Sequence, residues 1–196
     1  MIGRGTCKWL NGEEYEGEWQ MGVRHGKGRL VGVRGSVYDG DWRDDERSGT
    51  GSCKYSSGDI YEGEWARDVK HGLGSYTWSN GSSYTGDWLH GKMHGQGTFR
   101  YVNGEEYHGP MANGIKHGKG THVFLNSDTW EGEWVDDVPH MLGMYRFTST
   151  GATAAGEFSP KVRSSVTCVF VFILTVSHRA LLTRYHFFSA EGLWVA

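Results

Sequence analysis

The sequence predicts an all-β chain: an elongated, twisted single antiparallel sheet of about six tandem β-hairpins, each 23 residues long. One observation is an aromatic residue that recurs every 23 residues, at Tyr15, Tyr38, Tyr61, Tyr84, Tyr107 and Trp130. Another is a tryptophan four residues after five of these positions, at Trp19, Trp42, Trp65, Trp88 and Trp134. A third is glycine, which stands midway between the two aromatic columns and follows them as a Gly-x-Gly pair, first at Gly26 and Gly28. A fixed period of this kind is typical of linear arrays of repeated supersecondary units.

Each unit is expected to form a hairpin. Its first strand alternates, with Tyr15, Gly17 and Trp19 on one face and Glu16 and Glu18 on the other, which is the period of a half-buried strand. Turn residues follow as Met21-Gly22 and, in later units, as Asp44-Asp45, His90-Gly91 and Asn113-Gly114. After the return strand, stretches such as "SSGD" and "VNGE" predict a second turn into the next unit.

A two-residue loop at 21–22 predicts the register of the first hairpin. The expected pairs are Tyr15 with Gly28, Gly17 with Gly26, and Glu18 with His25. A flat ring can lie over a neighbouring strand only where that strand has no side chain, so the glycines are expected beneath the rings. The two aromatic columns are therefore predicted to form the core as a ladder of stacked rings, with no second layer required.

The pattern Tyr-x-Gly-x-Trp, a turn and His-Gly-x-Gly, repeated every 23 residues, resembles the MORN (membrane occupation and recognition nexus) repeat over residues 3–158. The segment "EGEWVDDVP" is similar to the closing repeat of small standalone MORN proteins of sperm and motile cilia. The expected organisation is a half repeat over 1–14, six MORN repeats over 15–153, a fading repeat over 154–160 and a non-repeat tail over 161–196. Because the chain opens in the second half of a repeat, a natural N-terminal part is expected to be missing.

Two units depart from the pattern. The fifth places Pro110 and Met111 where the others have an acid and a tryptophan. Proline cannot donate to a strand ladder, so this strand is predicted to be a bend or a weak joint. The sixth unit loses its Gly-x-Gly pair at "HMLG", as expected where an array fades into a terminal cap.

The tail has a different composition from the repeats. Its apolar run from Val166 to Val176 is 11 residues long, whereas a membrane-spanning helix needs about 20. A strand-like or interfacial segment is therefore predicted. The stretch "KVRS" at 161–164 also suggests the hypothesis that the tail is intron read-through or an alternative exon.

Charge and cysteine content limit the class of protein. The first 160 residues carry 16 basic and 22 acidic side chains, a net charge of −6, which disfavours nonspecific binding to nucleic acid or to an anionic membrane. No apolar leader segment opens the chain, and Cys7 and Cys53 occupy equivalent positions two repeats apart, roughly 19 Å by strand spacing. A disulfide between them is therefore excluded, and a cytoplasmic location is expected.

The histidine column has an acid column opposite it. The predicted cross-strand hydrogen-bonded pairs are Glu18 with His25, Glu64 with His71, Asp87 with His94, and Glu133 with His140. Successive histidines are about 10 Å apart by strand spacing, too far to share a metal ion. No metal site and no cofactor are expected.

A basic column accompanies the histidines. It comprises Arg24, Arg47, Lys70 and Lys116, joined by Lys27 and Lys119. One interpretation is an edge that binds anionic lipid headgroups, as the family name implies. The other is an ordinary solvated loop edge whose charge discourages edge-to-edge pairing.

No catalytic motif appears in the sequence, so the chain is not expected to be an enzyme. The leading hypothesis is a scaffold that binds protein partners along the ribbon, and the resemblance implies a cilium, flagellum or sperm structure. The alternative is a peripheral membrane module that binds phosphoinositides through the basic edge. A third interpretation is the targeting fragment of a longer enzyme. Homodimers occur among MORN relatives, so self-association is also expected.

Overall fold

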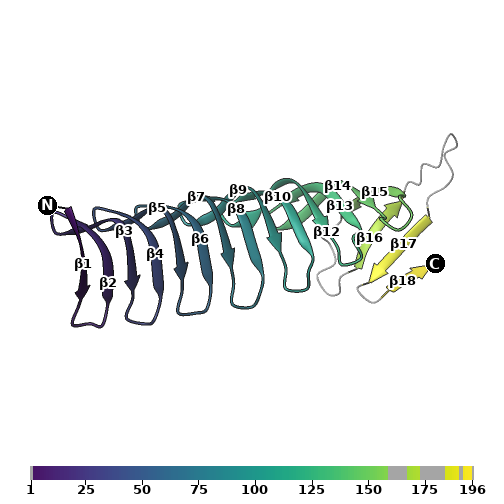
Figure 1. The fold of residues 1–196 in the computed structure, drawn as a ribbon. Coiled ribbons are helices and arrows are strands. Elements are labelled where there is room, and N and C mark those ends of the chain that lie inside the picture. The colour runs from purple at the N-terminus through teal and green to yellow at the C-terminus, as the bar shows by residue number, and fades with distance from the viewer. Residues whose placement is uncertain (1, 159–166, 173–183, 190–191, 196) are drawn as a thin grey trace. The chain divides into compact units, whose positions relative to one another are not determined.

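The computed structural model describes residues 2–158, 167–172, 184–189 and 192–195, and contains strands, turns and loops there but no helix. Strands β1 to β15 belong to an antiparallel sheet whose strand order is the chain order, apart from the short β11, which pairs with β10. The predicted fold class, all-β with tandem antiparallel hairpins, is confirmed (Figure 1). The chain divides into two compact units, Met1–Val102 and Asn103–Ala196, which we describe in turn.

The first unit holds the strands β1 (Ile2–Lys8), β2 (Glu14–Gln20), β3 (Val23–Val31), β4 (Val37–Arg43), β5 (Glu46–Lys54), β6 (Ile60–Ala66), β7 (Val69–Thr77), β8 (Ser83–Leu89) and β9 (Lys92–Arg100). Two-residue turns connect β2 to β3 and β4 to β5. Their residues have positive φ at both positions, 51° and 87° at Met21-Gly22 and 51° and 67° at Asp44-Asp45. Such turns match the right-handed twist of the strands that they connect.

The register of each hairpin differs from the expected one beyond the turn. The observed Cα partners in the first hairpin are Glu18 with His25, Gly17 with Gly28, and Tyr15 with Leu30. The cause is a β-bulge that inserts Gly26 and Lys27 into β3, with Gly26 at a φ of 61°. This conformation suits glycine, which has no Cβ to clash. The same shift recurs in the hairpins β4–β5, β6–β7 and β8–β9.

Rings nevertheless lie over glycines, because each tyrosine leans along its strand to a diagonal neighbour. A Cβ placed on Gly28 would lie only 2.5 Å from Cε2 of Tyr15, and one on Gly74 would lie 2.7 Å from Cε2 of Tyr61. The ring-over-glycine principle therefore holds, although the directly opposite residue is not the glycine that the simple register predicted.

The second unit holds β10 (Glu106–Ala112), β11 (Ile115–Lys116), β12 (Gly118–Val123), β13 (Thr129–Val135), β14 (Val138–Arg146), β15 (Thr153–Phe158), β16 (Thr167–Phe172), β17 (Arg184–Ser189) and β18 (Gly192–Val195). β10 runs without interruption through Pro110, and the expectation that this strand is a bend or a weak joint stays a prediction. The return strand is interrupted instead, at His117, whose N–H donates to the Pro110 carbonyl at 3.2 Å. Gly118 accordingly has a φ of 93°, against 55° to 61° at the bulge glycines of the first unit.

The core of both units is the aromatic ladder. Tyr15, Tyr61, Tyr84 and Tyr107 are fully buried, and the other ladder residues except Trp19 are at most 5% exposed. The rings meet edge to face, as in the Tyr38–Trp65 pair with centroids 5.4 Å apart and planes at 87°, so they are not stacked as predicted. This arrangement brings the positive edge of one ring to the negative face of the next.

Part of the tail is described. β16 covers residues 167–172 of the apolar run, which is a strand there as predicted, and β16, β17 and β18 form a three-stranded antiparallel sheet. The rest of that run lies outside the described residues, and the hypothesis on the origin of the tail stays a prediction. Within the described ranges, no helix is long and apolar enough to cross a membrane. Cys7 and Cys53 are free thiols.

Candidate functional site

The candidate site is the face of the sheet that carries the ladder, which we call the aromatic face; the opposite side is the acidic face. The polar atoms of the ladder rings donate hydrogen bonds to backbone carbonyls. Tyr61 donates its hydroxyl to the Glu64 carbonyl at 2.9 Å. Trp65 donates its indole N–H to the Gly51 carbonyl of the preceding repeat at 3.1 Å. These rings therefore hold the hairpins together and offer no polar group to a ligand.

A second set of rings covers the ladder on the aromatic face of the first unit. We call it the aromatic stripe, and it comprises Tyr55, Tyr76, Trp78, Phe99 and Tyr101. Neighbouring rings are close, with centroids 4.7 Å apart for Tyr76 and Trp78, 5.3 Å for Trp78 and Phe99, and 4.8 Å for Phe99 and Tyr101. All five side chains are half-buried, unlike the ladder beneath them. The stripe is therefore a continuous, partly exposed aromatic surface.

The second unit has a corresponding set on its own aromatic face. His122 and Phe124 lie 4.7 Å apart, Phe124 and Tyr145 5.5 Å, and Tyr145 and Phe147 4.7 Å, and these side chains are also half-buried. Position 122 is a histidine, so this set contains one ring that is more polar than those of the aromatic stripe. Burial lowers the pKa of His122, and the Glu105 carboxylate, 3.2 Å from its Nε2, opposes that shift.

Carboxylates orient the stripe rings. Asp59 accepts the Tyr76 hydroxyl at 2.8 Å and the Ser79 amide at 2.8 Å, and these hydrogen bonds, the Ser79 amide first, lower its pKa. Asp128 repeats the arrangement in the second unit with the Tyr145 hydroxyl, at 2.9 Å. The hydroxyl ends of both tyrosines are therefore fixed, while their rings stay partly exposed.

The column of Arg24, Arg47, Lys70 and Lys116 also lies on the aromatic face, because each of these residues pairs across the two-residue turn with the tryptophan, or in one case the methionine, of its own hairpin. Arg24 places its guanidinium 4.3 Å from the Trp42 ring centroid, and Lys70 places its ammonium 4.4 Å from that of Trp88. Lys116 lies 4.2 Å from the Trp134 ring centroid. These cations pack against the ladder and are not a loop edge as predicted.

The two arginines are also ion-paired, each with the aspartate of the next two-residue turn. Arg24 Nε lies 3.0 Å from Asp45 Oδ1, and Arg47 Nε lies 2.8 Å from Asp68 Oδ1. Burial opposes ionisation of Asp45, but hydrogen bonds from the Arg24 amide and guanidinium outweigh it and lower the pKa of this carboxyl. The positive charge of both arginines is therefore largely neutralised within the sheet.

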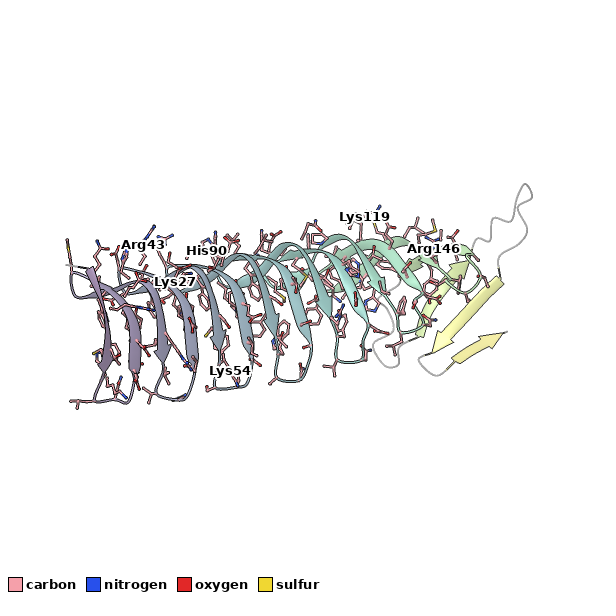
Figure 2. All side chains as sticks on the ribbon, in the orientation of Figure 1. Lys27, Arg43, Lys54, His90, Lys119 and Arg146 are labelled. Atoms are coloured by element: carbon pink, nitrogen blue, oxygen red, sulfur yellow. The ribbon has the colours of Figure 1, made fainter. Side chains whose placement is uncertain are left out.

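Lys27 and Lys119 lie on the acidic face, so the six predicted lipid-binding residues do not share one edge. Lys27 Nζ is 2.6 Å from Asp41, and Lys119 Nζ is 2.7 Å from Glu131. Figure 2 shows Lys27, Arg43 and His90 toward the edge of the first unit that holds the two-residue turns, and Lys54 toward the edge with the longer loops.

The predicted acid–histidine partners are opposite one another but use different hydrogen bonds. Glu18 with His25, Glu64 with His71, and Glu133 with His140 are Cα partners, whereas the register shift of the fourth pair falls at Asp87. The acids accept bulge amides instead: Glu64 accepts from Leu73 N at 3.0 Å, and Asp87 accepts from Gln96 N at 2.8 Å. The bulge turns these N–H groups toward the carboxylates, which therefore stabilise the bulge. In the described part of the chain, no three His, Cys, Asp or Glu residues could together hold a metal ion.

The aromatic stripe was missed by the sequence analysis, although a periodic signal was present. Aromatic residues recur every 23 positions in the turn after the return strand, at Tyr55, Trp78, Tyr101, Phe124 and Phe147. A search for a second aromatic column, outside the Tyr-x-Gly-x-Trp motif, would have found it.

The chain was compared with known proteins, solved structures and protein families. No curated protein matches the sequence. The chain is similar to the TCP domain of Drosophila melanogaster SAS-4 (dCPAP), solved with a proline-rich motif of Ana2 (dSTIL), at 13% identity, 87% coverage of this chain and 83% of that one, and a TM-score of 0.49. It is similar to the TCP10 domain of Danio rerio CPAP, solved with a STIL peptide, at 10% identity, 88% and 84% coverage, and a TM-score of 0.48.

The family model covers most of the chain. The MORN repeat matches six consecutive segments, residues 15–37, 38–60, 61–83, 84–106, 107–129 and 130–151. These segments begin at the tyrosine or tryptophan of the first aromatic column, so they coincide with the hairpins described above. The resemblance inferred from the sequence is confirmed, and the chain belongs to the MORN repeat family.

Proposed function

We propose that this MORN repeat chain is a non-enzymatic scaffold that binds segments of partner proteins on its aromatic face. The observation that carries the proposal is the aromatic stripe, in which five half-buried rings follow one another with neighbouring centroids 4.7 to 6.0 Å apart, beside a ladder that already forms the core. The ladder alone satisfies the structural need for burial. Partly exposed tyrosine and tryptophan side chains are the residues that most often dominate binding energy at protein interfaces.

The cation pattern favours a protein ligand over a membrane. A phosphoinositide headgroup carries several negative charges and is bound best by several available cations. Arg24 and Arg47 are neutralised by Asp45 and Asp68, and Lys27 is neutralised on the other face by Asp41. The phosphoinositide-binding module remains the alternative, and liposome co-sedimentation tests it below.

The test compares the full-length chain with Trp78→Ala, which removes the central ring of the stripe, and with Glu62→Ala, which changes an exposed residue of the acidic face. Partners captured from testis or ciliated cells are identified and then measured directly with purified protein. We expect Trp78→Ala to weaken binding by at least about tenfold, as for a typical interface hot spot, and Glu62→Ala to leave it unchanged. Equal affinities for all three proteins would refute the proposal.

Co-sedimentation of the full-length chain with liposomes, with and without phosphoinositide, tests the alternative. Binding that requires the lipid and disappears when Arg24, Arg47, Lys70 and Lys116 are changed to glutamate would favour the membrane module.

We also propose a cytoplasmic location in a cilium, flagellum or sperm structure, which the resemblance to small standalone MORN proteins supports. Localisation of the tagged protein in ciliated cells tests it. Self-association is a further proposal, which the homodimers among MORN relatives support. The mass in solution, measured by light scattering, tests that.

A further inference from the structure

Lys70 differs from the two arginines that occupy the equivalent position in the two preceding repeats. Arg24 and Arg47 reach the aspartate 21 residues later, at Asp45 and Asp68. The corresponding residue for Lys70 is Gly91, whose amide donates to the Lys70 carbonyl at 2.9 Å just as the aspartate amides do to the arginine carbonyls. The turn geometry is therefore the same, but the carboxylate is missing. Lys70 makes no ion pair with any carboxylate of the described chain.

The ammonium of Lys70 lies within the aromatic stripe. Its Nζ is 4.3 Å from the ring centroid of Tyr76 and 4.4 Å from that of Trp88. The side chain is half-buried, and burial lowers its pKa. The charge of Asp59 opposes that shift, but Asp59 makes no ion pair with Lys70 and accepts hydrogen bonds from the Tyr76 hydroxyl and the Ser79 amide. An ammonium held against rings, with no anion of its own, is suited to receive one from a ligand.

The residues at the equivalent position in the neighbouring repeats indicate how many negative charges the ligand carries here. In the repeat before Lys70, the equivalent residue is Arg47, which Asp68 neutralises. In the repeat after it, the equivalent residue is Met93, which carries no charge. The aromatic face therefore offers a single cation here, against the Tyr76 ring, and the stripe continues from Tyr76 to Trp78 and Phe99. A single carboxylate beside apolar groups matches this surface, whereas a polyphosphate headgroup would require several cations.

We propose that Lys70 binds the carboxylate of an aspartate or glutamate in an extended partner segment, whose adjacent apolar side chains pack on Tyr76, Trp78 and Phe99. This inference rests on the proposed function and specifies its partner: an acidic side chain next to aromatic, aliphatic or proline residues. The charge of the ion pair sets the register of the segment, and the rings supply the apolar contact area.

The experiment selects short random peptides displayed on phage with the full-length chain, and then measures the best synthetic peptide by calorimetry. We expect selected peptides to share an acidic residue next to apolar ones. Replacing that acid by its amide in the peptide, with the protein unchanged, is expected to weaken binding about tenfold. This step requires no protein variant, so misfolding cannot explain its result.

Protein variants identify the cation. Lys70→Met keeps an apolar stem over the rings but removes the charge, and should lose the difference between acid and amide peptides. Gly91→Asp supplies the aspartate that the earlier units have, at a position where Asp45 and Asp68 adopt φ values of 67° and 65°, and should neutralise Lys70 internally with the same loss. Lys92→Met removes an exposed lysine of the opposite face and should retain the difference.

Two outcomes overturn the inference, and they are distinguishable. If peptides bind the aromatic face but acid and amide forms bind equally to the unmodified chain, the role of Lys70 is refuted and the scaffold proposal stands. If no displayed peptide is enriched on the folded chain, both the inference and the proposed function are refuted.

Discussion

Trp65→Ala provides the sharpest test of how the hairpins hold together. Trp65 is 4% exposed, its ring centroid lies 5.4 Å from that of Tyr38 and 5.1 Å from that of Tyr61, and its N–H reaches the Gly51 carbonyl at 3.1 Å. Trp65 therefore joins two successive hairpins. Truncation removes two edge-to-face contacts, worth about 0.5–1.5 kcal/mol each, and leaves the carbonyl without its donor. With the lost burial, the free energy of unfolding should fall by about 3–5 kcal/mol.

Urea unfolding followed by far-ultraviolet circular dichroism measures this loss. For an m-value of about 2 kcal/mol/M, the midpoint should fall by roughly 1.5–2.5 M. Trp65→Phe, which retains a ring but lacks the indole N–H, should lose less, since it keeps most of the apolar burial. Glu62→Ala on the acidic face is the matched control and should change the free energy of unfolding by less than about 0.5 kcal/mol. Comparable midpoints for Trp65→Ala and Glu62→Ala would show that the two faces are assigned wrongly.

Three further predictions concern stability. Gly74→Ala should cost about 1–3 kcal/mol because the new methyl group overlaps the Tyr61 ring, whereas Gly3→Ala, with no atom within 4 Å, should be nearly neutral by urea unfolding. Burial raises the pKa of Tyr15 to about 12 from its usual 10, so its contribution to stability is intact below pH 10 and falls as pH rises from 10 to 12; a Tyr15 ring signal, assigned by nuclear magnetic resonance, that titrates near pH 10 in the folded chain would contradict this. Pro110→Asp should stabilise the chain by about 0.5–2 kcal/mol because it restores the acid found at this position in the other units, and an unchanged thermal midpoint would count against that role.

Much of the fold could be predicted because the same sequence pattern recurs in successive repeats. The 23-residue period, the alternation of Tyr15, Gly17 and Trp19, and the turn at Met21-Gly22 depend on local chemistry. Each is repeated along the chain, so a chance pattern in one unit could not mislead. The paired positions near the turn, such as Glu18 with His25, followed directly from the two-residue loop.

The register beyond the turn could not be predicted, because it depends on the bulge at Gly26. A Gly-x-Gly pair gives no sign of which glycine pairs with the opposite strand and which adopts a positive φ. That division appears only when the carboxylate above Gly26 and the ring above Gly28 are both in place.

The sequence by itself determined the repeat, the hairpin, the aromatic ladder and the family, because these follow from residue type and spacing along one strand. Only the tertiary structure decided what the charges do. Arg24 and Arg47 meet aspartates 21 residues away, while Lys70 meets a glycine turn, and this difference exists only after neighbouring hairpins align. Whether a cation is neutralised is set by distance in space, and strand pairing between successive units fixes that distance.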